Sequence, residues 1–269
     1  MQPPLDDLSA LVRPPRPFAD RVRFVVLMLV GVAFYVACLN IAQVDFARLW
    51  AGLPRLANWA ARAWPPDMSE FGLLTQRAAE TVAMGVVGTS FGMILAAPLC
   101  LLGARNVTPS RLLWLPARSF LNILRGVDSF VFALLLVAAV GLGPFAGVLG
   151  LALHSAGSIA KLWSETIETA KPGPIEAVTM SGASRLKVIR HAMLPDVLPS
   201  LASISLYMLE WSVRASTVLG VVGAGGIGQE LKNSVDLLAF DRVLTILLLI
   251  LAMVTVIDSI SGWLRKRLL

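Results

Sequence analysis

The sequence predicts an all-α, polytopic membrane protein with six transmembrane helices and a short helical segment on its cytoplasmic side. Three observations support this fold class. Of the 269 residues, 57% are hydrophobic and 15% are charged, whereas an average soluble domain is about 45–50% apolar and about 25% charged. The mean hydropathy is +0.75. Two runs, 24–41 and 81–102, contain no charged residue, and each can cross a hydrocarbon core about 30 Å thick.

Composition also excludes other classes of protein. A disordered chain would be polar and rich in charge. A secreted disulfide scaffold would need more cysteines than Cys38 and Cys100, which both lie in apolar runs. The net charge of +6 is explained by Lys and Arg in loops that flank membrane helices, so it does not predict a nucleic-acid partner. We therefore expect membrane lipid around most of the chain.

The expected spans follow from the uncharged runs and their interruptions. The uncharged stretch 129–160 is too long for one span and too short for two, and Gly141–Pro144 interrupts it. Because proline cannot continue a helix and glycine permits a reversal, this stretch predicts a tight hairpin whose helices extend into polar residues. The six expected spans are 24–41, 77–103, 118–142, 144–170, 194–222 and 242–263.

The connecting segments indicate the orientation. Lys and Arg are concentrated before the first span, between spans two and three, between spans four and five, and after the last span. This distribution favours cytoplasmic termini, although the first external loop opposes it with several arginines. The expected cytoplasmic segments are 1–23, 104–117, 171–193 and 264–269, and the expected external ones are 42–76 and the Gly-rich stretch 223–241.

The external loop 42–76 carries Trp50, Trp59 and Trp64 together with its arginines. Tryptophan and arginine are favoured at the level of the lipid headgroups. The loop therefore predicts an interfacial helix broken at Pro54. The alternative interpretation is a docking surface for an external partner.

The segment between spans four and five predicts a helix–turn–helix on the cytoplasmic face. Pro174 suits the start of a helix, and Glu176 would then lie in its first turn, near the positive end of the helix dipole. Gly182 permits a bend, and Leu186 begins a second short amphipathic stretch.

This segment resembles the EAA loop of ABC importer permeases. The matching residues are Glu176, Ala177, Gly182, Leu194 and Pro195, and the departures are Val178 and Ala192. The stretches that resemble the phosphonate-uptake branch of these permeases are 138–147, 153–157, 182–185 and 216–228. The resemblance covers most of the chain from Thr81 onward and does not include the first 75 residues.

The resemblance implies a type I importer fold with a permease domain at about 77–265. It implies that the loop forms a coupling helix that docks on an ATPase subunit, through Glu176, Ala177, Gly182, Ala183 and Leu186. The implied assembly is a homodimer of permeases in the bacterial inner membrane, with two ATP-binding subunits and an external substrate-binding protein. The implied cargo is a phosphonate-like anion. No cofactor is expected in this chain, because ATP and Mg would be bound by the partner.

Two charges within span five, Glu210 and Arg214, are four residues apart and share a helix face. Charges within a membrane are costly and usually face a cavity or one another. One interpretation is a neutralised pair that fixes helix packing. The other is that Arg214 lines the translocation pathway and presents its guanidinium to an oxyanion, with Glu210 holding it in place. We assign Ser216 and His154 to the same pathway. No metal site is predicted, because His154 has no partner at ligand spacing.

The glycines after span five satisfy the dinucleotide spacing G-x-G-x-x-G, but they follow a membrane span and not a β-strand. We interpret them as irregular backbone beside the pathway, and as part of an outer gate. They are Gly223, Gly225, Gly226 and Gly228. A second stretch, 88–92, has the G-x-x-x-G spacing that is typical of close helix packing.

The predicted function is that of a permease subunit in an ATP-driven importer of phosphonates. The chain has no G-x-x-x-x-G-K-[ST] phosphate loop and no H-E-x-x-H motif, so it is expected not to be an enzyme, and the ATPase is expected to be a separate subunit. The nearest alternative is the same machine with phosphite, phosphate or a D-amino acid as cargo. The alternative from another class is a secondary transporter or channel, which would need inverted repeats or a proton relay that we do not find. A membrane enzyme ranks third.

Overall fold

A computed structural model of the chain describes residues 18–108 and 110–268. Every regular element in these residues is a helix, so the all-α fold class is confirmed. Most of the expected cytoplasmic tail, 1–17, lies outside the described residues. Two compact units divide the chain, 1–58 and 59–269, and each is described by itself.

The first unit contains α1 (Phe18–Ile41) and most of α2 (Phe46–Arg62). In α1 the segment Val22–Ile41 is long and apolar enough to cross a membrane. The interfacial helix that we expected to break at Pro54 is one continuous helix with Pro54 inside it. That break was wrong, because a proline within a helix removes one hydrogen bond without always ending the helix.

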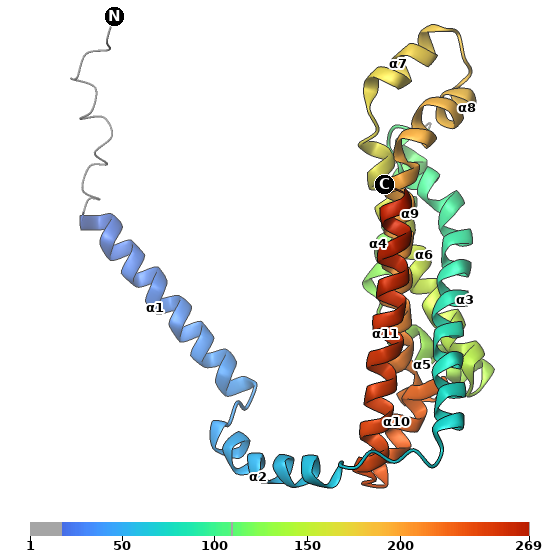
Figure 1. Cartoon of the computed structure of the whole chain (residues 1–269). Helices are drawn as coiled ribbons and strands as arrows, with labels where there is room; N and C mark the ends of the chain where they lie inside the picture. The colour runs from blue at the N-terminus through green and yellow to red at the C-terminus, as the bar shows by residue number, and fades with distance from the viewer. Residues whose placement is uncertain (1–17, 109, 269) are drawn as a thin grey trace, which may run out of the picture. The chain divides into compact units, whose positions relative to one another are not determined.

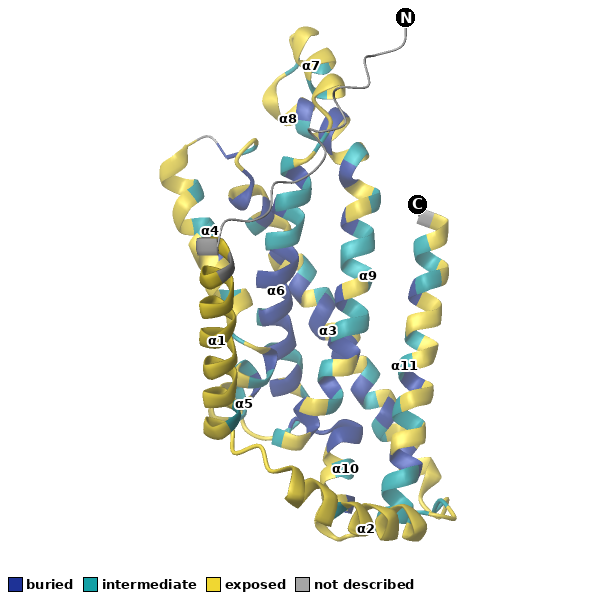
Figure 2. Ribbon diagram, turned by 90° about the vertical axis from the view of Figure 1, so that its left-hand side faces the viewer, coloured by how far each residue is buried: buried dark blue, intermediate teal, exposed yellow. Residues whose placement is uncertain are grey.

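The second unit is a bundle of long helices with a cap of short ones at each end (Figure 1). Its central helix is α6, most of which is buried (Figure 2). The long helices are α3 (Phe71–Gly103), α6 (Pro144–Glu168), α9 (Leu194–Leu219) and α11 (Phe240–Leu268). The short ones are α7 (Pro172–Met180), α8 (Arg185–Val188), the π-helix η2 (Ile189–Met193), the 3₁₀-helix η3 (Gly220–Val222) and α10 (Gly226–Asp236).

Glycines allow α3 and α6 to approach closely. A Cβ atom on Gly88 would lie 2.7 Å from Cβ of Leu151, and one on Gly92 would lie 2.6 Å from Cβ of Ser155. The G-x-x-x-G stretch therefore packs helices together, as predicted. Its letters also fit the G-x-S-x-G spacing of a nucleophile elbow, but Ser90 lies in mid-helix and donates its hydroxyl to the Val86 carbonyl at 2.7 Å.

The helix expected over 118–142 is in fact two helices, α4 (Arg111–Gly126) and α5 (Ser129–Val140), bent by 84° relative to each other. Asp128 begins α5, because its carboxylate accepts a hydrogen bond from the Phe130 N–H at 2.8 Å. Five described helices are long and apolar enough to cross a membrane, and this bent pair would be the sixth span. The expected hairpin after it is present, with Gly141 and Gly143 at φ of +93° and +134°.

Candidate coupling loop and translocation pocket

The loop between α6 and α9 projects from one end of the bundle, the end at which the chain also finishes (Figure 1). No residue of α7 is buried. Two large apolar side chains, Met180 and Leu186, are 83% and 75% exposed. Large apolar side chains exposed on a projecting loop are candidates for a protein contact surface.

Polar contacts hold the base of the loop on the bundle. The Lys171 N–H donates to Oδ2 of Asp196 at 3.1 Å, which joins the start of α7 to α9. The Arg185 guanidinium donates to the Asn106 carbonyl at 3.2 Å, which joins α8 to the connection between α3 and α4. These two contacts attach the loop to the bundle at Lys171 and at Arg185. The residues of α7 between them remain unburied and can contact a partner.

The five residues predicted for coupling lie together on this loop. Glu176 and Ala177 are exposed on α7, Leu186 is exposed on α8, and Ala183 is partly exposed between them. Gly182 has a φ of +77°, so it makes the predicted bend in a conformation that favours glycine. Glu176 is not in the first turn as expected, because the helix begins at Pro172 and not at Pro174.

The loop continues into a membrane span without interruption. The segments α8, η2 and α9 follow one another directly, and together with η3 they form a single candidate span from Arg185 to Val222. Buried Val188, Ala192 and Met193 attach the start of this helix to the bundle. The exposed loop and the charged residues of α9 therefore belong to one continuous helical segment.

The expected Glu210–Arg214 ion pair is wrong. The Glu210 carboxylate instead pairs with Arg265 of α11, with 2.8 Å between Oε1 and Nη2. Arg214 directs only its Nε toward the Glu210 backbone carbonyl, at 3.4 Å. Arg265 was expected in the cytoplasmic tail, but α11 extends through it to Leu268 and brings it against α9.

Arg214 faces a pocket of about 640 Å³ between α9 and the start of α5. Its guanidinium forms no ion pair with any residue that the structure describes. The aromatic rings of Tyr207 and Trp211 line the same pocket, together with Asp128 at the N-terminus of α5. The helix terminus contributes partial positive charge, while the Asp128 carboxylate contributes negative charge. This combination suits an anion that is bound and then released.

His154 supports this pocket and does not line it. Its Nδ1–H donates to the Val127 carbonyl at 2.9 Å, which satisfies the backbone where α4 and α5 separate. Its ring stacks on Trp211 with 4.6 Å between centroids. Ser216 lies elsewhere, because it is fully buried and its hydroxyl oxygen lies 2.7 Å from the Val213 carbonyl and 3.0 Å from the Thr81 carbonyl of α3.

The four glycines predicted for the outer gate lie at the end of the bundle opposite the loop (Figure 1). Gly223 and Gly225 lie between η3 and α10, and Gly226 and Gly228 belong to the first turn of α10. Gly223, Gly225 and Gly226 have positive φ values of +89°, +79° and +69°. Gly228 packs against the Thr217 carbonyl, so a side chain there would collide with backbone. The Ile227 N–H donates to Oγ1 of Thr81 at 2.8 Å. The backbone is irregular here, as predicted.

Arginine–carboxylate pairs fasten α10 to its neighbours at this same end. Arg242 of α11 pairs with Glu230 of α10 at 2.9 Å and with Glu70 at 2.8 Å. Arg77 of α3 lies 3.6 Å from Glu230 of α10, measured between Nε and Oε1, and so joins α3 to α10. The sequence interpretation missed this network and also missed Trp211, Tyr207 and Thr81, because residue type and local spacing do not reveal contacts between distant segments.

The fold and the site together define a membrane permease, an all-helical bundle with an open pocket at Arg214 and an exposed helical loop. The chain belongs to the family of binding-protein-dependent transport system inner membrane components, whose sequence profile matches residues 88–269.

Individual relatives extend this likeness. The chain is 48% identical over 259 residues to HtxC of Stutzerimonas stutzeri, which bears the provisional name of a phosphite transport system permease protein; the match covers 96% of this chain and 89% of HtxC. It is 42% identical to the phosphite transport system permease protein PtxC of the same species, over 86% of this chain and 84% of PtxC. It is 39% identical to the phosphate-import permease protein PhnE of Mycolicibacterium smegmatis, over 94% of this chain and 48% of PhnE.

The match to HtxC over 96% of the chain includes most of the first 75 residues. The expectation that those residues share no likeness was therefore too narrow. Among solved structures, the permease of the MetNI methionine ABC transporter, in an inward-facing conformation, has a TM-score of 0.66 at 24% identity. That match covers 76% of this chain and 99% of the MetNI chain. This likeness shows the fold alone.

Proposed function

We propose that the chain is the membrane-spanning subunit of an ATP-driven importer whose cargo is a phosphonate or a closely related phosphorus oxyanion. The observation that carries the proposal is Arg214, a guanidinium without an ion pair among the described residues, which faces a pocket on the helix that continues from the exposed loop. The names of HtxC, PtxC and PhnE support phosphite and phosphate as neighbouring members of the same cargo class.

The pocket supports transport of a small anion. Removing an anion from water is costly unless donors replace its hydration, and the planar guanidinium fits tetrahedral oxyanions with paired hydrogen bonds. The nearby Asp128 carboxylate limits the attraction, so that the anion is released after it enters. In this role Arg214 binds the cargo, Trp211 and Tyr207 shape the pocket, and His154 positions Trp211.

The loop supports coupling to a separate ATPase. Exposed Glu176, Ala177 and Leu186, with Ala183 beside them and the bend at Gly182, form the surface that docks on that subunit. When the ATPase subunits close, α8 is displaced and the continuous helix moves Arg214, so that the pathway opens to the other side. ATP and Mg are bound by the partner, and this chain carries neither.

We assign the opposite end of the bundle to the outer gate, formed by Gly223, Gly225, Gly226 and Gly228. Support comes from their irregular backbone and from the ion pairs of Glu230, which hold α10 against α11. The proposed assembly contains two copies of this permease, two ATP-binding subunits and an external substrate-binding protein. The chain lies in the bacterial inner membrane with both termini in the cytoplasm, so that the loop reaches the ATPase.

The test is uptake by proteoliposomes that contain the permease, its ATP-binding subunits and its binding protein. We expect ATP-dependent uptake of labelled methylphosphonate or phosphite, and none when a non-hydrolysable nucleotide replaces ATP. Phosphate and D-methionine serve as competing cargoes. Preference for D-methionine would reject the cargo class. Uptake by the permease alone, without partners or nucleotide, would reject the ATP-driven mechanism in favour of a channel or secondary transporter.

A further inference from the structure

A second pocket, separate from the one at Arg214, lies at the connection between α3 and α4. Its volume is about 370 Å³, and its lining residues are Arg105, Thr108, Ser110, Arg111 and Trp114. It lies at the end of the bundle that carries the coupling loop, because the Arg185 guanidinium of α8 reaches the Asn106 carbonyl in the same connection.

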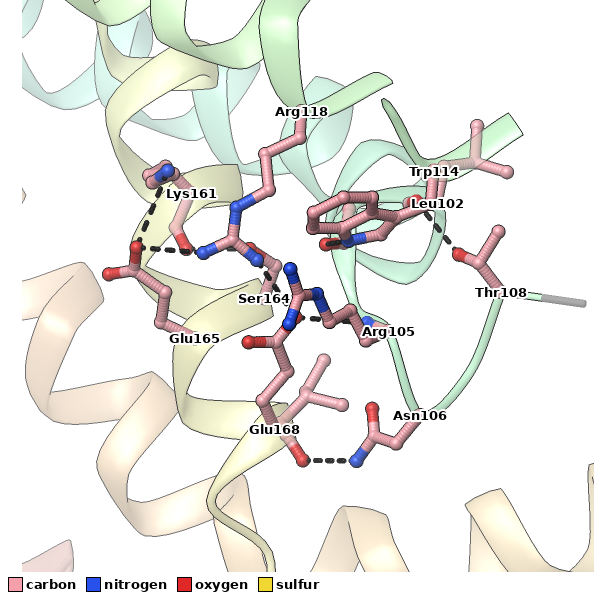
Figure 3. A network of polar contacts seen from close by, with 12 residues as sticks. Leu102, Arg105, Asn106, Thr108, Trp114, Arg118, Lys161, Ser164, Glu165 and Glu168 are labelled. Atoms are coloured by element: carbon pink, nitrogen blue, oxygen red, sulfur yellow. Dashed lines mark hydrogen bonds and ion pairs between the residues drawn. The ribbon is translucent and has the colours of Figure 1, made fainter. Parts of the chain in front are cut away.

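The pocket is built around Trp114 (Figure 3). The indole N–H donates to the Gly103 carbonyl at 2.9 Å, which fixes the ring. The Arg105 guanidinium lies over the ring at 4.3 Å from its centroid, and that of Arg118 lies at 5.4 Å. Thr108 donates its hydroxyl to the Leu102 carbonyl at 2.8 Å and closes the connection. The Arg105 side chain is thus held in place without a carboxylate partner.

The carboxylates nearby are already engaged by other groups. Glu168 accepts from the Arg118 guanidinium at 2.8 Å and from the backbone N–H of Arg105 at 2.9 Å. Glu165 pairs with Arg118 at 3.3 Å and with Lys161 at 3.4 Å. In the part of the chain that the structure describes, the guanidinium groups of Arg105 and Arg111 form no ion pair. The pocket therefore contains two uncompensated cations.

We propose that this pocket binds the phosphate of an anionic phospholipid headgroup. Two guanidinium groups, the hydroxyl of Ser110 and the N-terminus of α4 supply donors for a phosphate. The lipid source is favoured because apolar side chains flank the pocket on α4: Leu112 is 86% exposed and Leu115 is 59% exposed. An acyl chain would cover them, and tryptophan and arginine are favoured at headgroup depth. The assignment of this pocket to the cytoplasmic leaflet rests on the proposed function, whereas the lipid-binding proposal itself does not.

The experiment measures phospholipid retained by the purified complex in mixed micelles. The probes are phosphatidylglycerol, phosphatidylcholine and inorganic phosphate. The variant R105Q/R111Q removes both cations, and R111Q alone preserves the stacking of Arg105 on Trp114 in case the double variant folds poorly. The matched control is K266Q, an exposed cation in the last turn of α11. Lipid is quantified after detergent washing, so the readout needs no transport.

We expect the double variant to retain at least fivefold less phosphatidylglycerol, R111Q to show an intermediate loss, and K266Q to match the wild type. Equal retention of phosphatidylcholine, or unchanged retention by the folded double variant, would overturn the proposal. Displacement of phosphatidylglycerol by millimolar inorganic phosphate would also overturn it and would identify a free-phosphate site. A transport failure with lipid retention intact would reject the proposed function and leave this inference standing.

Discussion

Glu210 of α9 and Arg265 of α11 form an ion pair across two membrane helices, although they are far apart in sequence and only 2.8 Å apart in the structure. The Glu210 side chain is 13% exposed. Because Arg265 neutralises the Glu210 carboxylate, Glu210 does not pair with Arg214. The positive charge of Arg214 can therefore act on an anion in the pocket that it lines.

The variant R265Q is expected to destabilise the bundle, because it leaves a largely buried carboxylate without its charged partner. The expected loss in free energy of unfolding is about 1–3 kcal/mol. Thermal unfolding of the detergent-solubilised chain measures it. The double variant E210Q/R265Q should recover most of the loss, because neither charge is then left alone, and K266Q should have no effect. A melting temperature unchanged in R265Q would show that the pair contributes nothing.

The variant R214Q is expected to reduce uptake at low cargo concentration by about tenfold or more, which corresponds to the loss of one charge-assisted hydrogen bond of about 1.5–3 kcal/mol. Its melting temperature should stay within error of the wild type, because Arg214 forms no ion pair with the residues that the structure describes. R214K, which keeps the charge, should retain part of the activity. The matched control is R125Q, an exposed arginine that does not line the pocket. Wild-type uptake by R214Q would make Arg214 a packing residue.

The variant G182V is expected to abolish coupling, because valine is strained at a φ of +77° by about 1–3 kcal/mol and the chain between α7 and α8 would be redirected. Co-purification of the ATPase subunit and cargo-stimulated ATP hydrolysis measure the effect. The control is G173A, since a Cβ on Gly173 meets nothing within 4 Å and its φ is not positive. Normal co-purification together with normal stimulation in G182V would remove the coupling role of the bend.

The variant G157A is expected to lower stability by about 1–3 kcal/mol through overpacking. A Cβ there would lie 2.5 Å from Cβ of Leu124 and 2.8 Å from the Arg125 backbone nitrogen. These atoms belong to the last turn of α4, so the substitution also disturbs the bend that shapes the Arg214 pocket. The control at the same junction is G126A, where a Cβ meets nothing within 4 Å. Equal unfolding temperatures for the two variants would contradict this packing argument.

Features that depend on local chemistry could be predicted from the sequence. The bend at Gly182, the hairpin at Gly141–Pro144 and the close packing of 88–92 each follow from what glycine or proline permits. The bend between α4 and α5 also had a local signal, since Gly126 can end a helix and Asp128 can begin one. We gave this signal less weight than the uncharged stretch 129–160, which favoured a single helix over 118–142.

Features that depend on tertiary packing could not be predicted in the same way. The helical spacing of Glu210 and Arg214 allows a pair, but it does not reveal that α11 supplies a competing arginine at closer range. Ser216 shares a helix with Arg214, yet its register turns it toward α3 and away from the pocket. The placement of Trp211 against His154 likewise requires knowing that α6 lies beside α9.

The π-helical turn η2 lies where the loop enters α9. A π turn holds one more residue than an α turn. Converting η2 to α-helical geometry would therefore advance the residues on its N-terminal side by one position, which rotates them by about 100° around the helix axis. The docking surface on α7 and α8 would then rotate about the helix axis while α9 stays folded. Under the proposed function, movement of the docked ATPase would therefore reach α9 as a rotation about the helix axis in addition to a displacement.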